Sequence, residues 1–108
     1  MYKVHLTALT EKQWKSIAKG DRNSGKRIFE ALGSLEQNPR PPGIKTLLPG
    51  FYRLRVGNYR IFYLVADDVN TVVVSGIERR SEATYKKMGT RKQQAEEVAK
   101  KIRRKSKK

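Results

Sequence analysis

The sequence predicts an α+β fold in the order β-α-α-β-β-β, followed by a short C-terminal helix and a basic tail. Apolar and polar residues alternate over residues 2–7, apolar residues recur at helical spacing over 10–36, and three β-rich runs lie within 51–77. Two amphipathic helices in succession bury their apolar stripes most simply on one face of an antiparallel sheet. The other face of the sheet is then bare, and a functional site is expected there.

The first predicted strand, residues 2–7, alternates apolar and polar side chains. Tyr2, Val4 and Leu6 share a face that is suited to burial. His5 lies on the opposite face and is interpreted as a surface histidine. The strand is therefore expected to be half buried.

Two helices are predicted to follow as a hairpin, the first over residues 10–19 and the second from Asp21. Thr10 and Gln13 have the spacing of a capping box, Gly20 ends the first helix, and an aspartate can cap the second. The second helix carries apolar residues at helical spacing, at Ile28, Leu32 and Leu35.

The proline-rich segment 38–43 breaks the second helix, because proline lacks an amide hydrogen and restricts the residue before it. Residues 51–65 carry the strongest β signal, as two alternating runs separated by Gly57-Asn58. A two-residue loop of this composition favours a hairpin with a primed turn. A second turn cluster at 67–70 precedes the last β-rich run, residues 71–77.

The hairpin brings like charges together on the bare face. With 57–58 as the loop, Arg55 pairs with Arg60 and Arg53 pairs with Phe62. Arginines directly opposite each other destabilise a sheet by roughly tenths of a kcal/mol, so a chain selected only for folding would avoid them. The pattern indicates an anion site of guanidinium groups that bind phosphate oxygens in pairs. The alternative is a solvated strand face whose long basic side chains cover Phe62.

The last β-rich run is expected to extend this cluster. With 67–70 as the loop, alternation places Arg79 near Arg60, whereas a loop of different parity would turn Arg80 inward instead. Tyr85 lies at the start of a last short helix that Ser81 can cap. It is predicted either to pack that helix against the sheet or to stack on a base beside the arginines.

The composition limits the chain to one domain with little scope for metal or thiol chemistry. The 108 residues carry 25 Lys and Arg against 10 Asp and Glu, a formal net charge of +15. The lack of cysteine and the single histidine exclude a disulfide scaffold, a thiol nucleophile and the common zinc sites. No apolar run approaches the roughly 20 residues of a membrane span. No signal peptide is visible, so a cytoplasmic location is expected.

The basic residues are concentrated at the C-terminus, where residues 86–108 hold 11 of them and only two acidic ones. Residues 90–102 can form a helix with a thin apolar stripe, so we expect weak docking, followed by disorder over 103–108. The predicted division is a folded domain over 1–88 and a basic extension over 89–108. The extension is expected to attach electrostatically to a polyanion, with a solubility tail as the alternative.

Three motifs resemble the RelE/ParE superfamily of bacterial and archaeal type II toxins. They are Pro41-Pro-Gly-Ile-Lys45, Tyr52-Arg-Leu-Arg-Val-Gly-Asn-Tyr-Arg-Ile-Phe-Tyr63, and the Arg79-Arg80 pair followed by Tyr85. The resemblance covers residues 1 to about 88 and implies a RelE-like toxin domain that a cognate antitoxin neutralises. In the RelE branch such toxins enter the A site of the 30S ribosomal subunit. There they cleave mRNA without metal or cofactor, by attack of the ribose 2′-oxygen on the adjacent phosphate.

The resemblance also implies catalytic roles for the hairpin arginines. Arg53 and Arg55 match two basic positions that contact RNA and to which proton transfer has been assigned. Arg60 matches the arginine that stabilises the charge developing around phosphorus.

Similar roles are implied near the C-terminal end of the domain. Arg79 matches the basic residue that protonates the leaving 5′-oxygen, with Arg80 as the alternate. Tyr85 matches the aromatic residue that stacks on or orients the substrate. Further RNA contacts are expected from Arg80, Lys45, Lys86 and Lys87.

The sequence departs from many relatives in having no histidine beside the Arg79-Arg80 pair. Arginine stays protonated at neutral pH, so catalysis should depend on charge stabilisation and in-line alignment. Glu78 and Glu82 are interpreted as local partners of the arginine pair, with a general base as the minority interpretation.

Two other functions stay open at this point. A ParE-like toxin inhibits DNA gyrase with the same fold, and a degenerate member would only bind antitoxin or RNA. The arginine set favours the ribonuclease, because a gyrase inhibitor needs no phosphate-aligned cluster. The expected partner is an acidic antitoxin segment, expected to be helical, that lies across the bare face or displaces the last helix.

Overall fold

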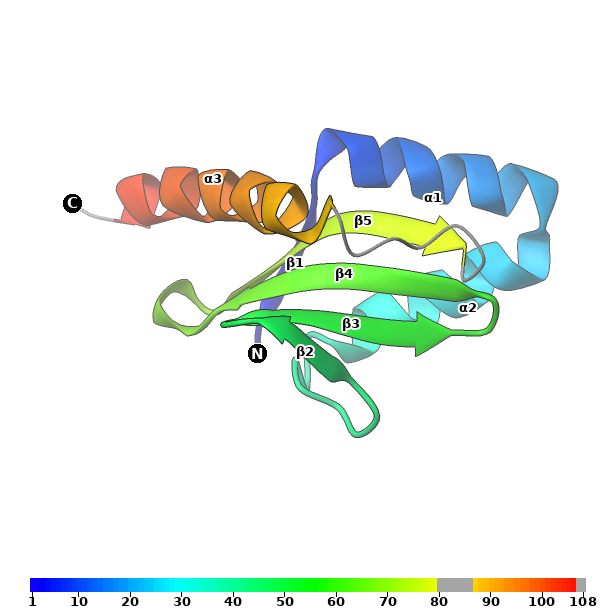
Figure 1. Ribbon diagram of the computed structural model, residues 1–108, viewed down its shortest axis with the longest axis horizontal. Coiled ribbons are helices and arrows are strands. Elements are labelled where there is room, and N and C mark those ends of the chain that lie inside the picture. Colours follow the sequence, from blue (N-terminus) through cyan, green and yellow to red (C-terminus); the bar gives the residue numbers. More distant parts are fainter. Residues whose placement is uncertain (80–86, 107–108) are drawn as a thin grey trace.

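The computed structural model describes residues 1–79 and 87–106 and, within them, a five-stranded sheet with three α-helices (Figure 1). The strands are β1 (Lys3–Leu6), β2 (Lys45–Leu48), β3 (Phe51–Val56), β4 (Tyr59–Ala66) and β5 (Thr71–Arg79). The helices are α1 (Ala8–Gly20), α2 (Arg22–Ser34) and α3 (Met88–Ser106), with a 3-10 turn η1 (Asp67–Val69) between β4 and β5. In these ranges no helix has both the length and the apolar character that crossing a membrane needs. The predicted α+β class is confirmed.

The sheet has the strand order β1-β5-β4-β3-β2 and is mixed rather than wholly antiparallel. β1 runs parallel to β5, while the β3–β4 and β4–β5 pairs are antiparallel as predicted, and β2 pairs antiparallel with β3. The helical hairpin separates β1 from the rest of the sheet, so no tight turn imposes an antiparallel partner on it. β2 is an additional edge strand beyond the predicted order β-α-α-β-β-β.

The two helices of the hairpin are capped by different means. α2 begins after Asp21, whose side chain accepts from the backbone N–H of Ser24, as predicted. α1 begins at Ala8 with Thr7 as its cap, because the Thr7 hydroxyl accepts from the backbone N–H of Thr10. Thr10, the predicted cap, is buried inside the first turn and donates its hydroxyl to the carbonyl of Val74 at 3.0 Å. The first helix therefore starts earlier than predicted.

Gly25 lets the two helices pack closely. A Cβ at this position would lie 2.6 Å from the Cα of Ala18, too close for any side chain. The Trp14 indole Nε1 donates to the carbonyl of Gly25 at 3.0 Å across the same contact. The hairpin thus behaves as one unit against the sheet.

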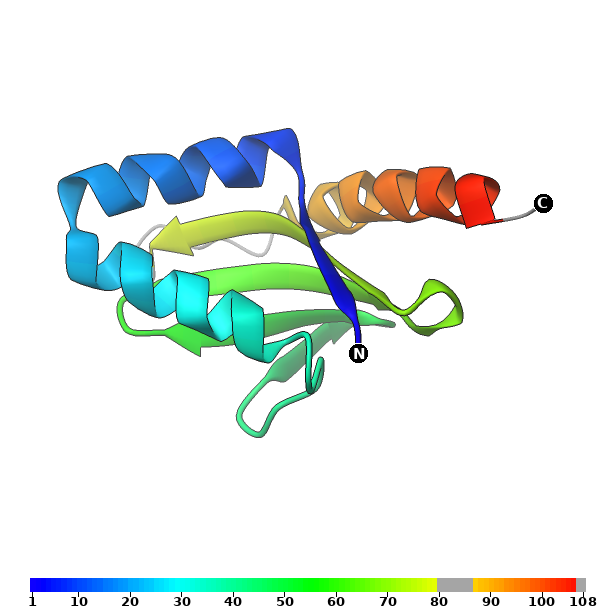
Figure 2. The same ribbon diagram turned by 180° about the vertical axis from the view of Figure 1, so that it is seen from behind.

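The two-helix hairpin covers one face of the sheet, as predicted (Figure 2). Tyr2, Val4 and Leu6 of the first strand pack at the margin of this core, and His5 is exposed. We call this side the hairpin face; its buried residues are Ile28, Leu32, Leu35, Tyr59, Ile61, Tyr63, Val65, Val72, Val74 and Ile77.

The opposite face is not bare, which corrects the prediction. α3 lies across β4 and β5 and closes a second core (Figure 1). Ala95 and Ala99, one helical turn apart, are fully buried there, and their small side chains let the helix approach the sheet closely. We call this side the α3 face; its buried residues are Phe51, Phe62, Leu64, Ala66, Val73, Met88, Ala95 and Ala99.

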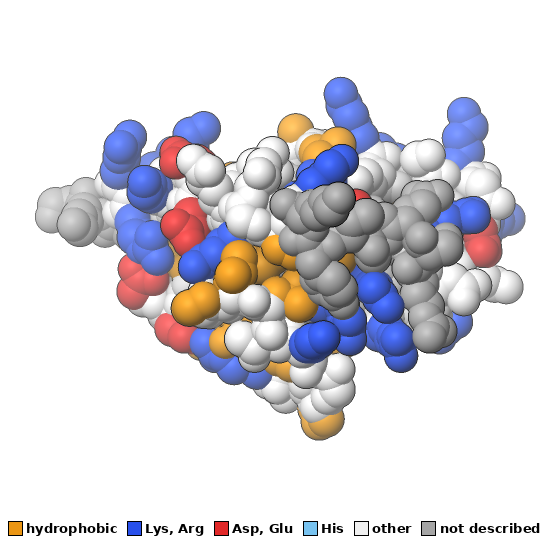
Figure 3. All heavy atoms as spheres, viewed as in Figure 1, with side chains coloured by type: hydrophobic (Ala, Val, Ile, Leu, Met, Phe, Trp, Pro, Cys, Tyr) orange, Lys and Arg blue, Asp and Glu red, His pale blue; other side chains and the backbone are white. Residues whose placement is uncertain are grey.

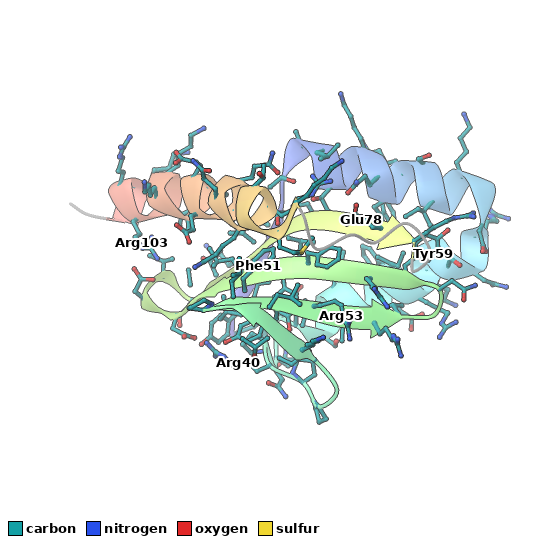
Figure 4. All side chains as sticks on the ribbon, viewed as in Figure 1. Arg40, Phe51, Arg53, Tyr59, Glu78 and Arg103 are labelled. Carbon is teal, nitrogen blue, oxygen red and sulfur yellow. The ribbon has the colours of Figure 1, made fainter. Side chains whose placement is uncertain are left out.

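α3 extends past its predicted end at residue 102, so residues 103–106 are helical rather than disordered. Arg103 donates from Nη2 to the Oδ1 of Asp68 at 3.0 Å and from Nε to Oδ2. Figure 4 shows Arg103 beside the loop between β4 and β5. A two-pronged bond of this kind fixes the end of the helix to the sheet. The helix start predicted at Ser81 lies outside the described residues.

The segment that follows α2 is tied to the sheet by Arg40 (Figure 4). Its guanidinium donates to both carboxylate oxygens of Asp67, at 2.7 and 3.2 Å, and to the hydroxyl of Tyr52 at 3.1 Å. Tyr2 donates its hydroxyl to the same carboxylate at 2.6 Å. Four parts of the chain therefore meet in the network formed by Arg40 and Asp67 with Tyr2 and Tyr52.

This network makes a pH-dependent contribution to stability. The Arg40 guanidinium, with the Tyr2 hydroxyl, holds the pKa of the Asp67 carboxyl below its ordinary value of 3.8. Such a group stabilises the fold above its ordinary pKa, and that contribution is lost as the pH falls through the folded-state pKa. We expect Asp67→Asn to lower the free energy of unfolding at neutral pH by at most about 1 kcal/mol, because the pair is exposed.

Urea unfolding at neutral pH and at about pH 2 measures this effect, and the difference from wild type should shrink in acid as Asp67 itself is protonated. Glu30→Gln, at an exposed position on α2, is the control. A difference that grows in acid would contradict the assignment.

Candidate functional site

The β3–β4 hairpin has the predicted register. Arg55 pairs with Arg60, and Arg53 pairs with Phe62. Gly57 in the turn has a φ of 58°, a left-handed conformation that glycine adopts without strain. Directly paired residues point their side chains to the same face, so the predicted adjacency of the arginines is confirmed.

The hairpin arginines lie on the α3 face. Phe62 belongs to the core beneath α3, and alternation along β4 puts Arg60 on the same side. Lys45 of β2 pairs with Arg53 and joins the group from the edge strand. Arg55 is exposed and Arg53 and Arg60 are half-buried; Figure 4 shows Arg53 on β3.

A bulge in β5 changes which of its residues face the arginines. Tyr63 pairs with Val74 and Phe62 pairs with Gly76, so Ser75 is an extra residue that pairs with no residue of β4. An extra residue shifts the alternation of the strand by one position. Side chains beyond the bulge are therefore reversed relative to the prediction.

The reversal moves Arg79 away from the arginines and brings Glu78 to them. Glu78 pairs with Arg60, and Arg79 pairs with Tyr59. Tyr59 and Ile77 belong to the core of the hairpin face, so Arg79 lies on that face as well. The prediction that Arg79 ends near Arg60 is wrong, because the extra residue changes the parity on which it depended.

Several predicted site residues lie outside the described part of the chain: Arg80, Glu82, Tyr85 and Lys86. Their roles stay predictions. Lys87, just before α3, is described and exposed.

α3 contributes an arginine that the sequence did not single out. A Cβ placed on Gly76 would lie 3.5 Å from the Nε of Arg91, 3.6 Å from its Cδ and 3.6 Å from the ring of Phe62. The Arg91 side chain therefore lies over Gly76 and beside Phe62. No spacing in the sequence marks this residue, which reads there as one of many basic residues in the extension.

We call Arg53, Arg55, Arg60 and Arg91 the arginine cluster. The Nε atoms of Arg60 and Arg91 and the Oε2 of Glu78 are buried, and no hydrogen bond reaches them in the described structure. An unsatisfied buried polar group costs about 1–3 kcal/mol, so a bound oxyanion that accepts from these guanidinium groups would recover free energy. The arrangement is suited to binding phosphate oxygens.

The surface around the cluster combines apolar and basic side chains. Figure 3 shows hydrophobic side chains exposed between α3 and the β2–β3 part of the sheet, with Lys and Arg side chains around them. Leu47, Leu48 and Val98 are partly buried at the margin of this core. Such a surface fits a polyanion with exposed bases or an acidic amphipathic segment.

Comparison with solved structures finds the same fold in several toxins. The archaeal RelE in the RelE–RelB complex from Pyrococcus horikoshii is 22% identical, with a TM-score of 0.64, and the match covers 76% of this chain and 98% of that one. The isolated E. coli RelE toxin is 17% identical, with a TM-score of 0.66, over 85% and 98% of the two chains. The toxin–antitoxin complex RelBE2 from Mycobacterium tuberculosis matches at 25% identity and a TM-score of 0.61, over 73% and 98%.

Comparison with curated proteins finds no match. A family model does match, that of the ParE toxin of the type II toxin-antitoxin system parDE, over residues 4–84. This range is well over half of the chain and contains the whole β3–β4–β5 sheet with its hairpin arginines. The chain belongs to this toxin family, within the RelE/ParE superfamily.

Proposed function

We propose that the chain is an endoribonuclease toxin that cleaves mRNA in the A site of the 30S ribosomal subunit. One observation carries the proposal, namely that paired strands and a docked helix hold four arginines on one face of the sheet. A fixed array of guanidinium groups matches the phosphates of an RNA backbone. The solved RelE and YoeB toxins of the same fold support the RelE branch.

The proposed reaction is a transesterification that needs neither metal nor cofactor. The 2′-oxygen attacks the adjacent phosphorus, the bond from phosphorus to the 5′-oxygen breaks, and the products carry a 2′,3′-cyclic phosphate and a 5′-hydroxyl. Arg53 and Arg55 bind the flanking phosphates, with Lys45 beside them. Arg60 stabilises the negative charge that develops around phosphorus.

The roles at the C-terminal end of β5 are divided differently from the sequence-based prediction. Arg79 is on the hairpin face, so it does not protonate the leaving 5′-oxygen in this arrangement. Arg80 and Tyr85 keep the roles that the resemblance implies, as acid and as stacking residue, with Lys86 and Lys87 as RNA contacts.

Induction of the chain in cells followed by mapping of mRNA ends tests the proposal. We expect cuts in phase with codons, and none for the Arg55→Ala/Arg60→Ala double variant. Lys19→Ala/Lys26→Ala removes the same charge from exposed positions on α1 and α2 and should leave the cuts unchanged. Intact mRNA together with double-strand DNA breaks and filamentation would instead show ParE-like inhibition of gyrase. A chain with neither effect would be a degenerate member.

The proposed partner is an acidic antitoxin segment that binds the α3 face or displaces α3. RelE is solved together with RelB, and YoeB together with YefM. Apolar residues ringed by positive charge favour an amphipathic acidic helix on this face. We expect the product of a neighbouring acidic reading frame to copurify with the toxin at high salt and to alter amide exchange along α3.

Leu47→Asp on the α3 face should weaken this complex, whereas Leu9→Asp on α1 should not. Leu9 is an exposed leucine, with an exposed fraction of 43%, and it lies on α1, away from this face. Equal weakening by both variants would place the antitoxin elsewhere.

The outer side of α3 is proposed to attach the toxin to ribosomal RNA. Lys101, Arg104 and Lys105 are exposed there. Because each neutralised phosphate contributes about 0.7–0.9 to the slope of log affinity against log salt, Lys101→Gln/Lys105→Gln should reduce that slope by about 1 to 2. Ribosome binding measured over a salt series checks this. Lys12→Gln/Lys26→Gln on the hairpin helices is the control, and an equal change in both would point to net charge alone.

A further inference from the structure

We propose that Glu78 is the general base of this site and accepts the proton of the ribose 2′-hydroxyl. The inference rests on the proposed ribonuclease function and names a residue for the one step that the arginines cannot perform. It follows from the bulge at Ser75, which turns Glu78 to the face on which alternation alone would place Arg79.

The carboxylate lies in line with the arginines that bind phosphate. Arg55, Arg60 and Glu78 are successive partners across β3, β4 and β5. Neighbouring strands are about 4.8 Å apart, so a phosphate held by Arg55 and Arg60 has its own 2′-hydroxyl within reach of Glu78. Figure 4 shows Glu78 toward the end of β5, on the strand two removed from Arg53.

The carboxylate has a free acceptor. Its Oε2 is buried and receives no hydrogen bond in the described structure. The charged groups around it are Arg60 from β4 and Arg91, which lies over the neighbouring Gly76, from α3. Lys12, Asp21 and Arg79 line the same cleft as Glu78 on the side of the helical hairpin. None of these forms an ion pair with Glu78 among the described residues, so the oxygen is available to a substrate proton.

Other carboxylates on this side of the molecule are occupied. Their ion pairs are Asp68 with Arg103, Glu96 with Lys92, and Glu97 with Lys100. Arginine and lysine side chains stay protonated at neutral pH, so the arginine cluster and Lys45 can stabilise charge but cannot take up a proton. Among the described carboxylates on this side of the molecule, Glu78 is the one without an ion pair, and its Oε2 is buried without a hydrogen-bond partner.

The step balances without any other reagent. The 2′-oxygen gives its proton to the Glu78 carboxylate as it forms its bond to phosphorus. The bond from phosphorus to the 5′-oxygen then breaks, and the 5′-oxygen takes a proton from the acid of the proposed reaction, which regains its proton from solvent. Glu78 returns its proton to solvent after the cyclic phosphate leaves.

Glu78→Gln tests the assignment, since it keeps the shape and removes the basic oxygen. We expect cleavage of ribosome-bound mRNA to fall by about 10²–10⁴-fold, as for other general bases. Binding of the toxin to ribosomes programmed with a 2′-deoxy message should stay within about threefold of wild type, because the phosphate contacts remain. Glu30→Gln on α2 is the matched control and should leave the cleavage rate unchanged.

The pH profile separates catalysis from a structural role. The pH dependence of the cleavage rate should differ between wild type and Glu78→Gln, because the variant lacks the oxygen that accepts the proton. Glu78→Ala should regain part of its activity with added formate, which supplies a small carboxylate in the space of the missing one.

The outcomes are distinguishable. Full activity of Glu78→Gln, or a variant that keeps the pH dependence of wild type, would overturn the role of Glu78 and leave the proposed function standing. A wild-type protein that does not cleave would overturn both. If Glu78→Gln fails to fold, the result with Glu78→Ala and formate decides, and a folded Glu78→Ala variant without rescue counts against the general base.

Discussion

Replacing Arg60 with alanine should lower the rate of RNA cleavage by about 100-fold or more, by analogy with the removal of a single oxyanion donor. Arg60 lies between Arg55 and Glu78 in the row of paired residues, where it can reach a phosphate held from either side. Its buried Nε has no hydrogen-bond partner in the described structure, so a substrate oxygen is the acceptor that it lacks. Single-turnover cleavage on programmed ribosomes measures the effect.

The same substitution should change the free energy of unfolding by less than about 1 kcal/mol, because cross-strand charge pairs contribute only tenths of that. Loss of the repulsion from Arg55 is offset by loss of the attraction to Glu78. Arg22→Ala, exposed on α2, serves as the control for net charge. An Arg60→Ala protein that is unfolded, or that cleaves at the wild-type rate, would contradict the role assigned to Arg60.

Replacing Ala99 with aspartate should undock α3 and lower the free energy of unfolding by about 2–5 kcal/mol, the range for burying an unpaired charge or losing a buried cluster. The Ala99 side chain is completely buried, with an exposed fraction of 0%, in the core of the α3 face. Undocking would also expose Phe51 and Phe62 and withdraw Arg91 from the arginine cluster. Cleavage should therefore fall together with stability.

Gln94→Asp places the same charge on an exposed position of α3 and should leave the melting temperature unchanged within a few degrees. Thermal unfolding of both variants gives the comparison. Equal melting temperatures for Ala99→Asp and wild type would show that α3 adds little to the stability of the core. They would then support the sequence-based expectation that the helix docks only weakly.

Local sequence determines the β3–β4 hairpin completely. The two-residue Gly57-Asn58 loop sets which residues face each other, and the alternation on either side sets which face they occupy. The pairing of Arg55 with Arg60 was therefore predictable without a structure. The same holds for the Asp21 cap, because its partner lies within one helical turn.

Other features depended on contacts between distant parts of the chain. Thr7 and Thr10 are both capable of capping α1, and the hydrogen bond from Thr10 to Val74 selects Thr7 as the cap. The sequence of β1 does not indicate whether the strand runs parallel or antiparallel to β5. No turn connects the two strands directly, so packing decides their relative direction.

The candidate site shows the same division. The sequence alone predicts that Arg53, Arg55 and Arg60 share a face, and that this face is basic. It did not reveal the bulge at Ser75, because β5 is buried on both faces over Thr71–Ile77, so no alternation of buried and exposed residues marks where an extra residue is inserted. Only the tertiary structure decided that Glu78, rather than Arg79, faces the arginines.

The second core was likewise decided by tertiary structure. Most side chains of residues 86–108 are charged, and the buried side of α3 is built mainly of small alanines whose burial contributes little apart from the sheet. The sequence therefore determined the charge of the extension and its helical tendency. α3 becomes part of the fold because it docks on Phe51 and Phe62, and this docking also brings Arg91 to the site. The apolar area that a helix buries depends on the surface it meets as well as on its own residues.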